Sequence, residues 1–156
     1  MRPHDPAAIL NRLCRFRGGV ADTSTLIYLE KCSLLEQVCT EYRILVPGEV
    51  VREFGRLPSG CRTVGARDTK DADTAVLAQA AARSLPVLSE DGKLLLRCSR
   101  QGVEYYNCLM LLHALLVQDA LDRAGFDRAY AALRCYARYS PGVWQVGRDV
   151  FSLFVR

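Results

Sequence analysis

The sequence lacks the long apolar segment and the export signal that would place it in a membrane or outside the cell. Its longest apolar stretch, Cys108–Val117, is interrupted by His113 and is far shorter than the roughly 20 residues of a membrane-spanning helix. The opening Met-Arg-Pro-His-Asp-Pro has no apolar run of the kind found in secretion signals. We therefore expect a cytoplasmic protein that neither spans a membrane nor is exported.

The sequence also lacks the cysteine spacings of zinc fingers and disulfide scaffolds. It has seven cysteines, an odd number, and no Cys-x-x-Cys pair. We expect reduced thiols, and those in apolar segments, such as Cys32, Cys98 and Cys108, to pack as small hydrophobic residues. There is no Gly-x-Gly-x-x-Gly or P-loop sequence, so no nucleotide cofactor is indicated. His113 lies among leucines and is expected in the core or at an interface.

The bulk composition is that of one soluble globular domain. A chain of 156 residues, 50% hydrophobic and 24% charged, is long enough to bury a core, so we predict a single domain over residues 1–156. The net charge is +4, and 18 of the 21 basic residues are arginine. This mild positive excess is compatible with a polyanionic partner such as nucleic acid.

Apolar runs and helical spacings alternate along most of the chain. The pattern predicts an α/β fold in which helices cover both faces of a parallel sheet. Helices are expected at residues 7–16, 23–32, 33–42, 48–56, 71–84, 93–100, 107–118 and 126–139, the last two strongly amphipathic. Strands are expected at residues 20–22, 43–47, 85–89 and near 63–64, with Thr23 or Ser24 capping the first helix after a strand. Residues 143–156 fit either a helix or a strand.

Four acids stand at strand ends or in the first turns of helices: Asp22, Glu53, Asp73 and Asp91. The carboxyl ends of parallel strands meet at one edge of a sheet, so we expect these side chains to converge. Clustered carboxylates repel one another unless a cation neutralises them, and oxygen ligands favour Mg²⁺ or Mn²⁺. Such a site would support metal-assisted hydrolysis of a phosphodiester.

Neighbouring residues could support this cluster or replace its members. Ser24 and Ser89 lie two residues from an aspartate and could hold it by hydrogen bonds. Glu49 is one helical turn before Glu53, and Asp71 begins the same helix as Asp73. Singly, each acid also has a structural explanation as a helix cap, an exposed helix face or a turn.

Four segments, in order, resemble the motifs of the PIN domains, a family of compact α/β nucleases. The sequence Asp-Thr-Ser-Thr-Leu-Ile-Tyr-Leu from Asp22 resembles the opening Asp-x-Ser motif. Val-Pro-x-x-Val-x-x-Glu-Phe is similar to the second motif and puts its ligand at Glu53 rather than Glu49. Asp-Thr-Ala-Val-Leu-Ala-Gln-Ala from Asp73 resembles the third, and Val-Leu-Ser-Glu-Asp ends at Asp91 like the fourth.

The resemblance covers about residues 20–103 and implies a three-layer α/β/α fold with four or five parallel strands. It also implies a Mg²⁺ or Mn²⁺ site at the four acids and cleavage of an RNA substrate. The family register prefers Asp73 to Asp71 and Asp91 to Glu90 as ligands. Its members include the ribonuclease toxins of type II toxin–antitoxin pairs (VapC-type), which are often dimers, so an antitoxin-type inhibitor and a homodimer are the partners it suggests.

The chain departs from the compact toxins at both ends. It has an N-terminal helix of its own and a helical extension at about residues 104–140, and this weakens the argument for a toxin specifically. A basic face at Lys93, Arg97 and Arg100 follows Asp91 and is a candidate for binding the RNA backbone; arginines near the start and Arg62, Arg67 and Lys70 are weaker candidates. The alternative function is a catalytically silent PIN-like module that binds nucleic acid or protein.

Overall fold

The computed structural model describes residues 5–65 and 71–155, so the expected basic residues Arg67 and Lys70 lie outside the described residues. The chain forms two compact units. One, the sheet unit, comprises Arg17–Cys108, and the other, the helical unit, comprises Met1–Phe16 together with Leu109–Arg156. The predicted core at about residues 20–103 falls within the sheet unit.

The sheet unit contains a five-stranded sheet in which every neighbouring pair is parallel, in the order β3-β2-β1-β4-β5. Val20 in the central strand β1 is level with Leu45 on one side and Val87 on the other. The five strands are β1 (Gly18–Ala21), β2 (Arg43–Pro47), β3 (Arg62–Val64), β4 (Val87–Leu88) and β5 (Tyr105–Tyr106). The structure thus confirms the predicted α/β fold with a parallel sheet.

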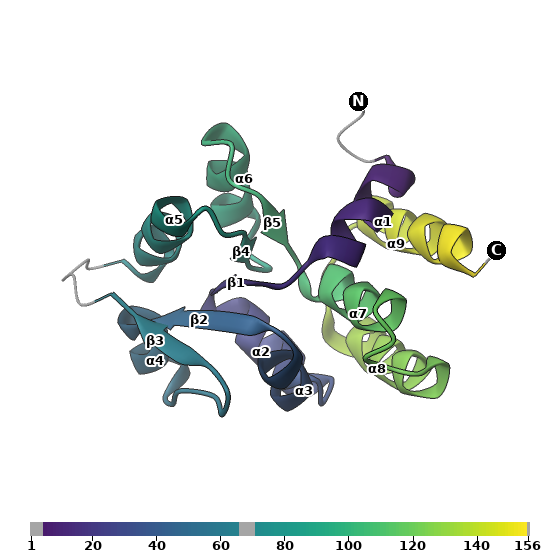
Figure 1. Cartoon of the computed structure of the whole chain (residues 1–156), viewed down its shortest axis with the longest axis horizontal. Coiled ribbons are helices and arrows are strands. Elements are labelled where there is room, and N and C mark those ends of the chain that lie inside the picture. The colour runs from purple at the N-terminus through teal and green to yellow at the C-terminus, as the bar shows by residue number, and fades with distance from the viewer. Residues whose placement is uncertain (1–4, 66–70, 156) are drawn as a thin grey trace. The chain divides into compact units, whose positions relative to one another are not determined.

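Helices connect the strands and cover both faces of the sheet. Figure 1 shows α2 (Thr23–Lys31) and α3 (Leu35–Glu41) on one side of it, and α5 (Ala72–Arg83) and α6 (Gly92–Arg100) on the other. The helix α4 (Gly48–Phe54) packs against α2 and β2. This is the expected three-layer α/β/α arrangement. The connections run outward from β1 to β3 and then return to β4 and β5 on the other side of β1.

The central strand begins two residues earlier than the sequence pattern predicted, because its first residues are glycines that the sheet requires. A Cβ atom on Gly18 would lie 2.1 Å from the carbonyl oxygen of Arg43 in β2. A Cβ on Gly19 would lie 2.7 Å from the carbonyl oxygen of Pro86, just before β4. The glycine pair therefore lets the neighbouring strands approach β1 closely.

The buried strands explain why the sequence shows apolar runs rather than alternation. Ile44, Leu45 and Val46 are all buried, since helices cover both faces of β2. The adjacent tyrosines of β5 differ in burial: Tyr106 is buried and Tyr105 is half-buried.

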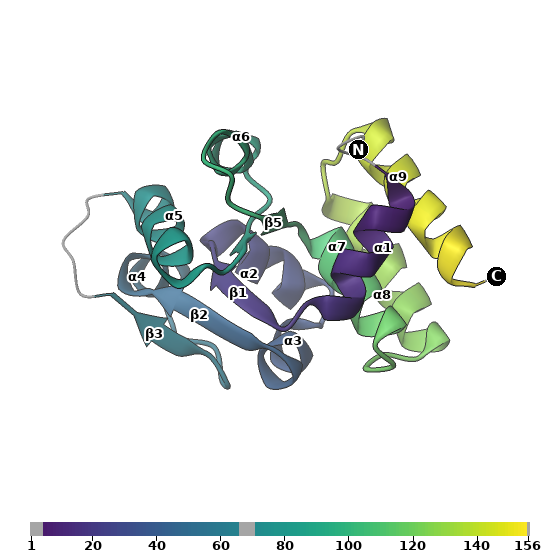
Figure 2. The same cartoon turned by 45° about the horizontal axis from the view of Figure 1, so that its top comes forward.

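The helical unit consists of α1 (Pro6–Arg15), α8 (Arg123–Tyr136), α9 (Pro141–Phe154) and most of α7 (Cys108–Val117). Figures 1 and 2 show α1 against α9, and these two helices are in contact. The side-chain nitrogen of Gln118 donates to the carbonyl oxygens of Leu13 and Phe16, at 2.7 and 3.0 Å, and so satisfies the end of α1. Rings pack within this unit, Phe126 lying 5.1 Å from His113 and 5.3 Å from Phe151.

Two expectations for the C-terminal region need correction or completion. The helix α7 is not amphipathic, because nearly all of its residues are buried. The segment left open between helix and strand belongs to α9, which covers residues 143–154 of it. This helix starts at Ser140, whose side chain accepts a hydrogen bond from the backbone N–H of Val143 at 3.3 Å, and Pro141 takes the first helical position.

His113 is 3% exposed and contacts the carbonyl oxygen of Leu109 at 2.7 Å, as expected of a core histidine. Among the helices described, none combines the length and the apolarity needed to cross a bilayer.

Candidate metal centre

Two of the expected acids lie at the point where the strand order reverses. From β1 the chain first adds β2 and β3 on one side, and later places β4 and β5 on the other. Asp22 directly follows β1, its backbone N–H donating to the carbonyl oxygen of Leu88 in β4 at 2.9 Å, and Asp91 follows β4 after two residues. In open parallel sheets the crevice beyond the carboxyl ends of these two strands is the usual ligand site.

Asp22 is held by three hydrogen bonds. Its Oδ1 accepts from the backbone N–H of Thr23 at 2.7 Å, which makes Asp22 the N-cap of α2. Its Oδ2 accepts from the hydroxyls of Ser24 at 2.8 Å and Ser89 at 2.7 Å. Asp22 itself caps this helix, so our expectation of Thr23 or Ser24 as the cap was wrong. The carboxylate is only 4% exposed, and these donors fix its orientation without neutralising it.

The two serines join the ends of β1 and β4. The Oγ of Ser89 donates to Asp22 and accepts from the backbone N–H of Asp91 at 3.0 Å. The Oγ of Ser24 accepts from the backbone N–H of Glu90 at 3.0 Å. The predicted supporting serines therefore contact Asp22 directly and tie it to the loop that carries Asp91.

Asp73 belongs to the same electrostatic neighbourhood. Partial burial, followed by the negative charges of Asp22, Asp91 and Asp71, raises the pKa of Asp73 to about 6, against a smaller opposing effect of Arg97. These like charges can act on Asp73 because α5 begins close to the same edge of the sheet. The structure thus brings three of the four expected ligands, Asp22, Asp73 and Asp91, within electrostatic reach of one another.

Asp71, and not Asp73, caps α5. The Oδ1 of Asp71 accepts from the backbone N–H of Asp73 at 3.1 Å, and its Oδ2 accepts from the hydroxyl of Thr74. The Thr74 hydroxyl is the main cause that lowers the pKa of Asp71, and Arg97, 3.8 Å away, adds to it. Our expectation that Asp73 could be a cap was wrong, so capping does not explain its position.

The second expected ligand, Glu53, is not among the charges that act on Asp73. Glu53 is exposed near the end of α4 and makes no hydrogen bond or ion pair with any described residue. Glu49 lies one turn earlier and is half-buried. Their assignment as a ligand and a supporting residue stays a prediction.

Glu90, which competed with Asp91 for the fourth ligand position, has contacts of its own. Its Oε2 accepts from the hydroxyl of Thr25 at 2.6 Å, and its Oε1 accepts from the backbone N–H of Cys108 at 2.8 Å. Sequence reasoning missed this role, because Thr25 and Glu90 are 65 residues apart and no local pattern connects them. Glu90 ties α2 and the start of α7 to the loop after β4.

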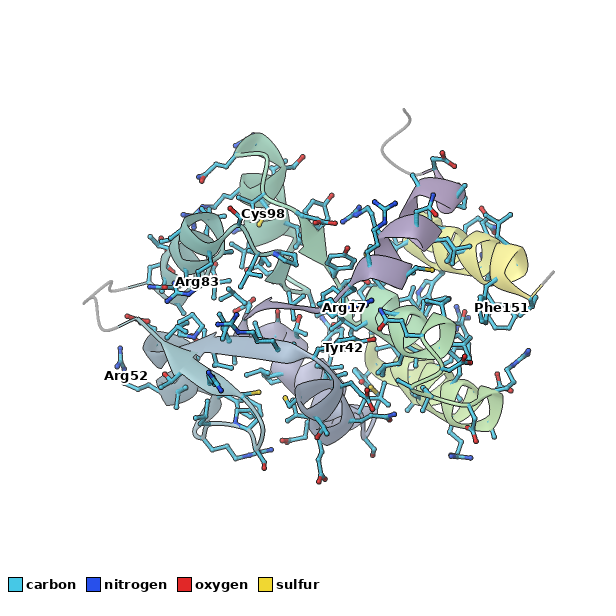
Figure 3. All side chains as sticks on the ribbon, in the orientation of Figure 1. Arg17, Tyr42, Arg52, Arg83, Cys98 and Phe151 are labelled. Atoms are coloured by element: carbon cyan, nitrogen blue, oxygen red, sulfur yellow. The ribbon has the colours of Figure 1, made fainter. Side chains whose placement is uncertain are left out.

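The basic residues expected to bind RNA lie on α6, where Lys93 and Arg100 are exposed. Arg97 is half-buried and donates to the Thr74 hydroxyl at 3.3 Å, beside Asp71. Figure 3 shows two further arginines on the outside of the sheet unit, Arg52 on α4 and Arg83 on α5. None of these contacts tests the binding of RNA, which remains a prediction.

The aspartate cluster has the chemistry of a hard-cation site, although its side chains are not gathered into a closed one. In the described part of the chain, no three Asp, Glu, His or Cys side chains are close enough together to hold a metal ion as they stand. The donors are nevertheless all carboxylate oxygens, and their mutual repulsion at Asp73 is what a divalent cation would relieve. The buried hydroxyl of Thr23, beside Asp22, also lacks a hydrogen-bond partner among the described residues. The chemistry of Asp22, Asp73 and Asp91 is thus compatible with a hard cation, and the binding of Mg²⁺ or Mn²⁺ at these residues stays a prediction.

Comparison with known proteins adds no name to this site. No family model matches the chain, and no curated protein matches its sequence.

Proposed function

We propose that this protein is a Mg²⁺- or Mn²⁺-dependent endonuclease that hydrolyses phosphodiester bonds of RNA. The observation that carries the proposal is the Ser89 hydroxyl, which connects the buried carboxylate of Asp22 with the backbone of Asp91 where two adjacent parallel strands end. Asp73 faces the negative charge of both. An aspartate whose pKa is raised by burial and by neighbouring carboxylates, at a topological switch point, is typical of a functional site rather than of a solvated surface.

Each residue has a stated part in this proposal. Asp22, Asp73 and Asp91 would hold the cation, with Glu53 as the fourth ligand by resemblance to the PIN domains. When bound, the cation would supply Lewis-acid stabilisation of charge on the phosphodiester. The serines keep Asp22 oriented through charge-assisted hydrogen bonds. Lys93 and Arg100 are exposed on the helix that Asp91 caps and would contact backbone phosphates.

RNA as the substrate rests on the PIN resemblance, since carboxylates and a cation serve DNA hydrolysis equally well. The same resemblance supports a cytoplasmic location, a homodimer and an antitoxin-type inhibitor as further parts of the proposal. The alternative, a silent module that binds nucleic acid or protein without cutting it, is favoured by one observation: Asp22, Asp71 and Asp91 all cap helices and so have a structural use without any metal.

The decisive experiment is RNA cleavage by asparagine variants. Asp22→Asn and Asp91→Asn should lose cleavage of a labelled single-stranded RNA in Mn²⁺ by at least about 100-fold, because each removes a charged ligand while asparagine still caps the helix. Asp5→Asn is the matched control, since Asp5 caps α1 of the helical unit in the same way. Circular dichroism would verify the fold of each variant.

Full cleavage by either site variant would refute the ligand assignment. RNA binding without cleavage by wild type, unaffected by Mn²⁺, would support the silent module instead. Parallel assays on single-stranded DNA test the substrate class separately, because a DNA preference would leave the metal site standing.

A further inference from the structure

A pair of cysteines in the sheet unit lies apart from the aspartate cluster and has no part in the proposed hydrolysis. Cys39 is on α3, and Cys61 directly precedes the edge strand β3. The thiol of Cys61 contacts the sulfur of Cys39 at 2.8 Å. A disulfide bond brings sulfur atoms to about 2.05 Å, so bond formation would need a movement of less than about 1 Å.

The backbone on both sides holds this pair in place. Gly60 packs against α3 so closely that a Cβ atom on it would lie 2.8 Å from the carbonyl oxygen of Cys39. The backbone N–H of Cys61 donates to the carbonyl oxygen of Pro58 at 3.1 Å and closes a turn. The approach of the two sulfurs is therefore a consequence of how the loop docks on α3, and not of one side-chain rotamer.

The two thiols differ in accessibility and in proton affinity. Cys39 is 3% exposed, whereas Cys61 is half-buried and can meet a small oxidant. The hydrogen bond from Cys61 lowers the pKa of the Cys39 thiol, with a further contribution from Arg56, and the same hydrogen bond raises the pKa of Cys61. Because the Cys61 thiol donates a hydrogen bond to the Cys39 sulfur, the loss of one proton from the pair is favoured, and this gives the thiolate that reacts with oxidants.

We propose that Cys39 and Cys61 form a reversible redox site that closes to a disulfide when the protein meets a hydroperoxide. One sulfur of the pair, as the thiolate, attacks the terminal oxygen of the hydroperoxide, so that an S–O bond forms, the O–O bond breaks and hydroxide leaves from hydrogen peroxide, or an alkoxide from an organic hydroperoxide. The second sulfur then attacks the resulting sulfenic acid, forming the S–S bond and releasing water. With hydrogen peroxide the two thiols lose two electrons and two protons, and the oxidant becomes two molecules of water.

The closed form would enclose residues 39–61 in a covalent ring that contains β2 and α4. Cross-linking two points of the chain restricts the unfolded state, so the oxidised protein should resist denaturation better than the reduced protein. This inference does not depend on the proposed nuclease activity, because neither cysteine belongs to the aspartate cluster.

A second close pair, Cys32 and Cys108, serves as an internal control. Their sulfurs are 4.0 Å apart and both residues are buried. Hydrogen bonding to Cys32 and burial raise the pKa of Cys108, so this pair should oxidise more slowly. Both pairs are present in every sample, which makes the comparison independent of oxidant dose.

The test is peptide mapping of the metal-free full chain, reduced and then treated with hydrogen peroxide. After alkylation and trypsin digestion, a disulfide should join residues 32–43 to residues 57–62, and fragmentation should place it at Cys39 rather than Cys32. Urea denaturation should show a higher midpoint after oxidation, and dithiothreitol should restore the original value. Cys61→Ser should lose both the cross-link and the shift, while Cys135→Ser, at an exposed cysteine, should keep them.

Three results would overturn the proposal. The first is a folded protein in which Cys39 and Cys61 remain fully alkylatable after peroxide has oxidised the exposed Cys14 and Cys135. The second is oxidation of Cys61 to sulfinic acid without a cross-link. The third is an equal yield of the Cys32–Cys108 disulfide.

Discussion

Neutralising Asp73 should stabilise the folded protein at neutral pH, and the gain should disappear in acid. Burial and the neighbouring aspartates raise the pKa of Asp73 from 3.8 to about 6 in the folded state. A carboxyl group with a raised pKa stabilises the fold while it is protonated, below its unfolded pKa, and this contribution is lost as the pH rises through about 6. Asparagine copies the protonated form, so Asp73→Asn should keep the stability that wild type loses.

The expected size of the effect follows from the two pKa values. A difference of about two pH units corresponds to about 3 kcal/mol at 1.36 kcal/mol per unit. Asp73 is partly exposed, and solvent screening reduces that figure. We therefore expect Asp73→Asn to raise the free energy of unfolding by about 1 kcal/mol at pH 8 and by nothing measurable at pH 3.

Asp71→Asn is the matched control. Asp71 lies two residues away, and its pKa is shifted in the opposite direction. Hydrogen bonding to Thr74 lowers the pKa of Asp71, so its carboxylate contributes stability above pH 3.8 that is lost as the pH falls. Asparagine retains the capping role, and the variant should be less stable than wild type at pH 8, with the difference shrinking in acid.

Urea denaturation followed by circular dichroism, at pH 3 to 8 with EDTA present, measures all three proteins. If Asp73→Asn destabilises the protein at pH 8, or if its gain is the same at every pH, the aspartates do not repel one another as inferred. The electrostatic argument for a cation site would then fail.

Two further substitutions test the neighbourhood of the site and the strand that carries it. Ser89→Ala should lower the free energy of unfolding by about 2 kcal/mol, because Asp22 loses a charge-assisted hydrogen bond inside the protein and the backbone N–H of Asp91 loses its acceptor. Urea denaturation at pH 7 measures this free energy, and a change below about 0.5 kcal/mol would contradict the prediction. Gly18→Ala should destabilise by more than about 3 kcal/mol or prevent folding, whereas Gly92→Ala, where an added Cβ meets nothing within 4 Å, should be neutral or slightly stabilising. Equal thermal midpoints for the two glycine variants would show that the close approach at β1 is not needed.

The parts of the fold that sequence predicted are those fixed by local pattern. The apolar run 43–47 became β2 with the same bounds, and the alanine-rich segment became α5 within one residue at each end. The start of β1 was missed, because a glycine in a strand is explained only by the neighbouring strands that approach it. The strand order was not predicted either, and it is the reversal between β1 and β4 that places Asp22 beside the loop of Asp91.

The candidate site shows the same division. Sequence spacing was sufficient to select Asp22, Asp91 and their two serines, since each serine lies two residues from its aspartate. The contact of Ser89 with Asp22 spans 67 residues, and only the sheet pairing shows that it exists. The place of Glu53 in the site stays a prediction, because a helical register states which face a residue is on but not how far that face lies from another strand.

The caps at Asp22, Asp71 and Asp91 also bear on how this site would change during evolution. A helix that begins at an aspartate is destabilised when that residue is lost, so selection for folding alone would retain all three acids whether or not the proposed nuclease activity exists. Asp73 is not a cap, and its charge is unfavourable at neutral pH in the absence of a cation. Without selection for cation binding, Asp73 is therefore the position where substitutions would accumulate first, and the three capping acids alone are weak evidence for the proposed activity.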